Sequence, residues 1–168
     1  FKQADYDCYP EETNRTHFVA DLLENFEKFS TEKKIVVLDG RVIGLRNQGG
    51  VFFIDLKDGM DLRHQEIKIQ IVVKKDTLKN FELFRDNLDI GDFIEVTGVL
   101  FVTQKGEKSV EAKNLKLLVK SLRPLPDQWA GLSDIETRLR QRYLDLLINP
   151  ELKEMFLLDE KLIYNPHH

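Results

Sequence analysis

One aromatic side chain and one amide stand where two neighbouring strands would present them to solvent. Apolar residues alternate over residues 51–56, which places Phe53 on the opposite face from them. The same alternation over residues 67–73 turns Lys68 and Gln70 outward. An exposed ring can stack on an unpaired base, and an amide can pair with its Watson–Crick edge. The residues expected to point inward are Phe52, Ile54, Leu56, Ile67, Ile69, Ile71 and Val73.

Three charged residues extend this candidate site. Arg46 ends the preceding segment and could bring a guanidinium to a phosphate or a base carbonyl. The turn at residues 104–107 offers a donor, Lys105, and an acceptor, Glu107. Two plainer readings stay open: a charged glycine turn is more often a solvated hairpin, and an exposed phenylalanine can be covered by a helix or a neighbouring domain.

Hydrophobic periodicity predicts the elements that position these side chains. Helical spacing over residues 18–29 predicts an amphipathic helix with Thr16 as its N-cap, and residues 76–88 predict a second helix capped by Asp76. Gly40 and Gly44 indicate a bulge or coil in a long, strongly bent first strand. The predicted strands are residues 35–46, 51–56, 67–73, 93–103 and 109–122, with a long polar hairpin at 57–66.

This order, three strands, a helix and two strands, is that of a mainly β, five-stranded oligonucleotide-binding (OB) Greek-key barrel. Residues 1–32 form a lead-in and helix, and residues 33–123 form the barrel, which ends at Pro124 and Pro126. Residues 124–156 are expected to be a linker toward an absent domain, with a docking helix at 135–148. Residues 157–168 read as an atypical tail that ends like a tag remnant.

Composition limits the possible functions. The net charge is −4, but residues 33–123 carry 17 Lys and Arg against 13 Asp and Glu, so the barrel is mildly basic and its flanks are acidic. This surplus is too small for tight binding by phosphate neutralisation alone, so recognition should rest on a few bases. A single cysteine, Cys8, excludes an intramolecular disulfide and suits a reducing cytosol. No apolar stretch is long enough to cross a membrane.

The sequence contains no recognisable active site. His17 and His64 have no second ligand nearby in sequence, which argues against a metal site. Neither a phosphate-binding glycine loop nor a nucleophile motif is present. We therefore expect no catalytic residue and no cofactor in this chain.

A long ordered match identifies a family resemblance. Residues 118–127, LVKSLRPLPD, are followed by Gly131-Leu132 and by residues 140–146, RQRYLDL; together with residues 53–58 and Asn149-Pro150-Glu151 they resemble class II lysyl-tRNA synthetases. The resemblance covers about residues 9 to 156. It separates the lysyl enzymes from the aspartyl and asparaginyl ones, which share the barrel but not this linker.

The resemblance implies that Phe53 stacks on the central uridine of the lysine anticodon, that Gln70 reads its edge with help from Arg46, and that Glu107 approaches a neighbouring base. Because the ATP, magnesium and lysine sites of the family lie in later motifs, this chain alone should not aminoacylate tRNA. It would belong to a cytoplasmic, homodimeric parent that ligates lysine to tRNA with ATP and Mg. The alternatives are a non-specific single-strand binder and a dimerisation or interaction fragment.

Overall fold

The computed structural model describes residues 9–60, 66–123, 135–149, 152 and 155–156. The chain divides into two compact units, Phe1–Arg123 and Pro124–His168.

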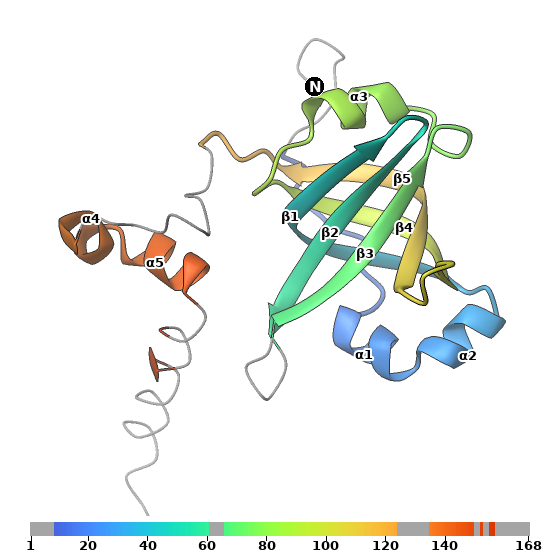
Figure 1. Ribbon diagram of the computed structural model, residues 1–168, viewed down its shortest axis with the longest axis horizontal. Coiled ribbons are helices and arrows are strands. Elements are labelled where there is room, and N and C mark those ends of the chain that lie inside the picture. The colour runs from blue at the N-terminus through green and yellow to red at the C-terminus, as the bar shows by residue number, and fades with distance from the viewer. Residues whose placement is uncertain (1–8, 61–65, 124–134, 150–151, 153–154, 157–168) are drawn as a thin grey trace, which may run out of the picture. The chain divides into compact units, whose positions relative to one another are not determined.

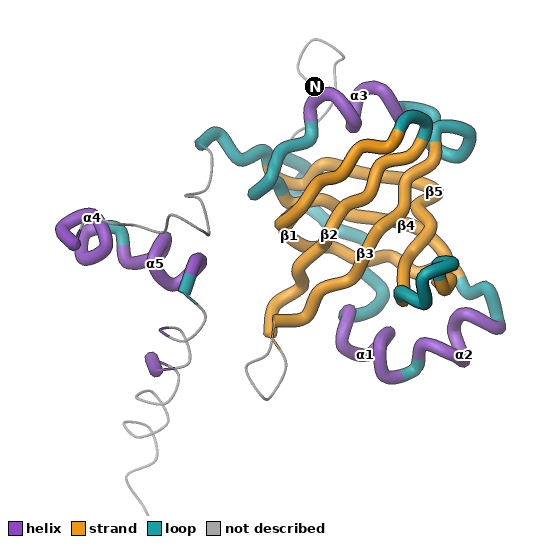
Figure 2. The backbone as a smooth tube through the Cα atoms, in the orientation of Figure 1, coloured by secondary structure: helices purple, strands orange, loops and turns teal. Residues whose placement is uncertain are grey.

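Five strands of the first unit form a closed barrel with the order β1-β2-β3-β5-β4. All neighbouring pairs are antiparallel except β3 and β5, which pair in parallel over three positions. The predicted five-stranded OB fold is thereby confirmed (Figure 1; Figure 2). The strands are β1 (Ile35–Gln48), β2 (Val51–Met60), β3 (Glu66–Lys74), β4 (Phe93–Val102) and β5 (Lys108–Val119).

Local sequence explains how the barrel curves. The register between β1 and β2 shifts between Val42 and Gly44, where a bulge was predicted. β1 and β2 are joined at Gly49 and Gly50, and Gly49 takes a φ of +62° that suits glycine. Alternate residues of every strand point into a continuous apolar core, as the period of two requires.

Helices close the two ends of the barrel (Figure 1). α3 (Phe81–Asn87) buries Phe81 and Phe84 at one end, where the Phe81 ring lies 5.2 Å from that of Phe52. α1 (Val19–Glu24) and α2 (Phe26–Thr31) cover the other end with Leu22 and Phe26. Full burial of each such side chain contributes about 1.5–3 kcal/mol.

Both predicted helix caps are wrong. α1 starts after Phe18 with no side-chain cap, and the Thr16 hydroxyl instead accepts a hydrogen bond from the backbone N–H of Val37 at 2.9 Å. The lead-in is thus tied to β1, which leaves Thr16 too far upstream to cap. α3 begins only after Asn80, because residues from Asp76 onward first form turns. The first helical stretch is also interrupted, at Asn25.

Ion pairs fasten the lead-in to the barrel wall. The guanidinium of Arg15 lies 2.7 Å from Asp39 of β1 and 2.6 Å from Asp58 of β2. Buried Glu95 of β4 accepts hydrogen bonds from the Thr13 hydroxyl at 2.8 Å and from a backbone N–H at 2.6 Å. These contacts satisfy carboxylates that would otherwise be costly to bury.

Two further predicted boundaries require correction. The loop between the second and third strands is shorter than predicted, because β2 continues to Met60 and β3 already starts at Glu66. In the second unit, the predicted helix at 135–148 consists of α4 (Ile135–Arg140) and α5 (Arg142–Ile148), which are separated at Gln141. The predicted tail at 157–168 lies outside the described residues.

Candidate nucleic-acid interface

The outer faces of β2 and β3 carry the predicted ring and amide. Phe53 is half-buried on the outside of β2, while its neighbours Phe52 and Ile54 are buried in the core. Phe53 pairs in register with Val72 of β3, and Gln70 stands two residues further along the same face. A diagonal pair of this kind keeps two long side chains within reach of one ligand. The structure therefore places the ring and the amide side by side on adjacent strands.

Arg46 lies directly across from Phe53 on β1. Its guanidinium carbon is 5.9 Å from the centre of the Phe53 ring, and one nitrogen donates a hydrogen bond to Asp55 at 3.1 Å. The arginine side chain is 55% exposed and the aspartate 35%, so water screens this ion pair and it contributes little to stability. A pair of this kind can exchange readily for a phosphate or a base.

Gly44 explains how Asp55 comes to lie flat against β1. The two residues are opposite one another, and a Cβ at Gly44 would lie only 2.6 Å from a carboxylate oxygen of Asp55. The absence of a side chain at this position therefore leaves space for the carboxylate that holds Arg46. The alternation over residues 51–56 also places Asp55 on the outer face, but Asp55 was not predicted to belong to the site.

Gln70 is held by two residues near the start of β5. Its amide nitrogen donates to Glu107 at 3.0 Å, and its amide oxygen accepts from the Ser109 hydroxyl at 3.1 Å. Ser109 is fully buried and is the parallel-strand partner of Gln70. The prediction associated Glu107 with the same site, whereas Ser109 was missed because the parallel pairing of β3 with β5 is not legible from sequence spacing.

The two candidate lysines are exposed at the borders of this face. Lys105 lies in the β4–β5 turn, and Lys68 lies on β3 opposite Lys57 of β2. No ion pair is described for Lys68 or Lys105 within the ranges of the chain that the structure covers. Their charges are available to a polyanion.

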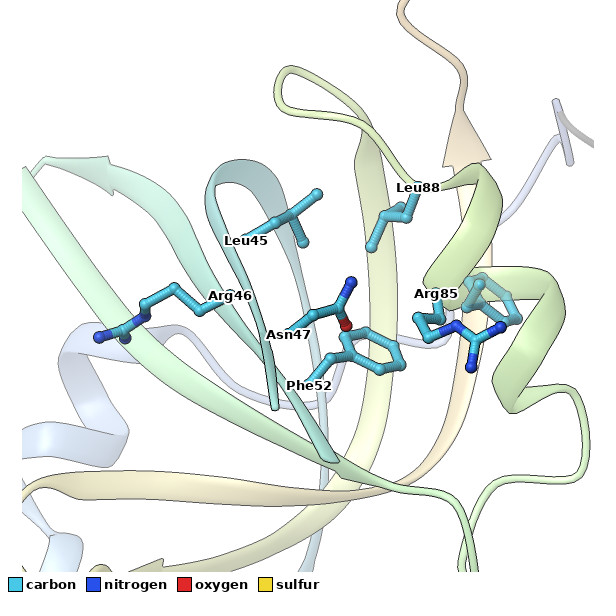
Figure 3. Close-up of a pocket in the computed structure, with 7 residues that line it drawn as sticks. Leu45, Arg46, Asn47, Phe52, Arg85 and Leu88 are labelled. Carbon is cyan, nitrogen blue, oxygen red and sulfur yellow. The ribbon is translucent and has the colours of Figure 1, made fainter. Parts of the chain in front are cut away.

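A small pocket lies behind Arg46, between the β1–β2 hairpin and α3 (Figure 3). It has a volume of about 20 Å³, which is room for about one water molecule and not for a base. In Figure 3 the Arg46 side chain points away from Phe52 and Arg85. The open outer face, and not this pocket, is therefore the surface on which a nucleotide could lie.

In the parts of the chain that the structure describes, no group of three or more His, Cys, Asp or Glu residues is arranged to hold a metal ion. The Nδ1 of His17 lies 2.7 Å from the hydroxyl oxygen of Thr16, and its ring packs edge-on against Phe29. None of the described helices has the length and apolar character needed to span a bilayer.

Comparison with known proteins agrees with this geometry. Residues 36–118 match the tRNA anticodon family, described as an OB-fold nucleic acid binding domain. This stretch begins in β1 and ends in β5, so the match coincides with the barrel. The first unit is therefore an OB-fold domain of the tRNA anticodon-binding class.

Similarity extends well beyond the barrel. The chain is 45% identical over 151 residues to a lysine–tRNA ligase of Thermoanaerobacter pseudethanolicus, a match that covers 89% of this chain and 28% of that protein. It is 39% identical to a lysine–tRNA ligase of Roseiflexus over 96% of this chain and 32% of that protein. It is also 39% identical to lysine–tRNA ligase 2 of Methanosarcina mazei over 92% of this chain. The chain belongs to the lysyl-tRNA synthetase family and spans less than a third of the length of these relatives.

Proposed function

We propose that this chain binds the anticodon arm of lysine tRNA through the outer face of β2 and β3. The observation that carries the proposal is the position of the Phe53 ring, half-buried on the outside of an OB barrel and diagonal to the Gln70 amide on the next strand. The similarity to lysine–tRNA ligases supports the choice of tRNA.

Each side chain would have a distinct part in binding. The Phe53 ring would stack on the central uridine, for which half-burial is favourable because the surrounding strands hold the ring at little entropic cost. Gln70 would pair with the edge of that base. Arg46 would exchange Asp55 for a phosphate or a base carbonyl, since their exposed ion pair is weak. Lys68 and Lys105 would attract the backbone on either side.

The charge balance of this face favours base reading over sequence-independent binding. Carboxylates of Asp55 and Glu107 lie among the cations of this face. Binders without base preference use a strongly basic groove with several stacking platforms. A mixed face loses phosphate attraction but gains acceptors that can distinguish one base edge from another.

The longer relatives suggest what the parent protein does. We infer that the full-length protein is a cytoplasmic lysine–tRNA ligase that uses ATP and Mg, and that this chain alone does not aminoacylate tRNA. The residues that would hold ATP and the metal would then lie outside this chain. The parent would form a homodimer, for which Ile135, Leu139 and Tyr143 are exposed apolar candidates.

Titration with RNA stem-loops tests anticodon binding. The 168-residue chain is mixed with a labelled lysine-anticodon stem-loop, and separately with one whose central uridine is replaced. We expect weaker binding to the second, and equal affinity for both would refute anticodon reading.

Replacement of the stacking ring tests its assigned role. Phe53→Ala should weaken binding of the lysine stem-loop by about 1–3 kcal/mol. Phe18→Ala is the matched control, because Phe18 is an exposed ring that packs on Arg15 before α1 and lies outside the proposed interface. A wild-type affinity for the Phe53 variant would discard the stacking assignment.

A further inference from the structure

The Gln70 amide is held from both sides in a single orientation. Glu107 accepts a hydrogen bond from its nitrogen, and Ser109 donates one to its oxygen. The β4–β5 turn positions the glutamate: its backbone N–H donates to the Thr103 hydroxyl at 3.0 Å, and its carbonyl accepts from the Thr103 N–H at 2.9 Å. Gly106 takes a φ of +83° within this turn. The turn therefore holds the backbone of Glu107 in place near Gln70.

The chemistry of the two partners is unequal. An ionised carboxylate only accepts hydrogen bonds, whereas a serine hydroxyl both donates and accepts. If the amide of Gln70 were reversed, its oxygen would face the carboxylate oxygen of Glu107, and two acceptors would repel. Ser109 could adapt to either orientation by rotating its hydroxyl. Glu107 therefore selects the orientation, and Ser109 reinforces it.

Orientation matters because an amide can match two different pyrimidine edges. Uracil presents a donor N3–H beside a carbonyl acceptor, whereas cytosine presents an acceptor N3 beside an amino donor. A glutamine free to turn its amide over can satisfy either edge with one N–H and one oxygen lone pair. A glutamine that cannot turn satisfies only one of them.

We propose that Glu107 and Ser109 set the preference of this site for uracil over cytosine by locking the amide of Gln70. The inference rests on the proposed anticodon binding and adds to it the origin of selectivity at one base. Glu107 acts as a positioning residue through Gln70, and Ser109 is a second positioning residue.

The test compares stem-loops with uracil or cytosine at the central anticodon position. In Glu107→Gln, the new side-chain amide at position 107 can either accept from or donate to Gln70. The variant therefore no longer favours one orientation of the Gln70 amide over the other. We expect the ratio of uracil to cytosine affinity to fall by about fivefold or more, which corresponds to one hydrogen bond. Cytosine binding should improve relative to uracil even if the loss of a negative charge strengthens both. Ser109→Ala should lower the ratio less.

Glu111→Gln is the matched control. Glu111 is another β5 carboxylate, but it pairs with Lys74 rather than with Gln70, so its removal changes the charge and leaves the amide held. The ratio should stay at its wild-type value in this variant. Circular dichroism checks that each variant is folded. We expect Glu107→Gln to fold normally, because Glu107 is exposed.

Two failures are distinguishable. If the wild-type chain does not prefer the lysine stem-loop over an unrelated one, anticodon binding fails and the inference falls with it. If the wild type prefers uracil and Glu107→Gln retains the same ratio within about twofold, well below the effect of one hydrogen bond, only the amide lock is overturned.

Discussion

The salt dependence of RNA binding measures how many phosphates this face can neutralise. This face has three exposed cations: Arg46, which forms an ion pair with Asp55, and the two lysines at its borders, Lys68 and Lys105. For a single strand, each phosphate neutralised makes the slope of log association constant against log salt concentration more negative by about 0.7. Three contacts therefore predict that the association constant for the stem-loop falls with a slope of about −2 in a plot of log constant against log salt.

Substitution of the two border lysines tests this count. The double variant Lys68→Met and Lys105→Met should have a slope of about −0.7, because only Arg46 then remains. Lys113→Met is the control, since Lys113 is an exposed lysine on β5 beyond the stretch that pairs with β3. Fluorescence anisotropy from about 50 to 200 mM salt gives the slopes. A wild-type slope steeper than about −5 would refute the reasoning, because it requires many phosphate contacts outside this face.

Two further predictions concern the barrel that holds the site. Gly98→Ala would bring a Cβ within 2.3 Å of the Glu111 carbonyl oxygen, so β4 and β5 must separate. We expect the free energy of unfolding in urea to fall by about 2–4 kcal/mol, whereas Gly50→Ala, which meets open space, should change it little; equal stability of the two variants would contradict this packing. Burial lowers the pKa of Lys120, but hydrogen bonds to Asp89 and Asp92 outweigh that effect and raise it above its ordinary value of 10.5. This stabilisation is present below pH 10.5 and is lost as the pH rises through the higher pKa of the folded state. The free energy of unfolding should therefore fall less at alkaline pH in Lys120→Met than in the wild type. An unchanged dependence of this free energy on pH would refute the prediction.

Elements with strong periodicity could be predicted from the sequence. The alternation around Phe53 identified the inner and outer faces of β2 correctly, because a strand buried on one side must place every second residue in the core. Val72 is an exception: it lies on the outer face opposite Phe53 but is 4% exposed. Its burial depends on neighbours from β2 and β5, which alternation within β3 cannot reveal.

Features that depend on contacts distant in sequence could not be predicted. Thr16 has the residue type of a helix cap, but it bonds to Val37, 21 residues away. Asp76 likewise has the right type, yet the chain turns before α3 begins. The contact of Gln70 with Ser109 joins residues 39 apart through a parallel pairing that no turn signal marks. Propensity describes what a residue can do locally, and tertiary contacts decide among those options.

The parallel pairing of β3 and β5 covers only three positions, from Gln70 with Ser109 to Val72 with Glu111. This short parallel pairing closes the barrel. Gln70, the residue proposed to read a base, belongs to its first residue pair. A nucleotide bound there would contact both β3 and β5. RNA binding would then also oppose the separation of β3 from β5, since a ligand that binds only the closed barrel stabilises it by mass action.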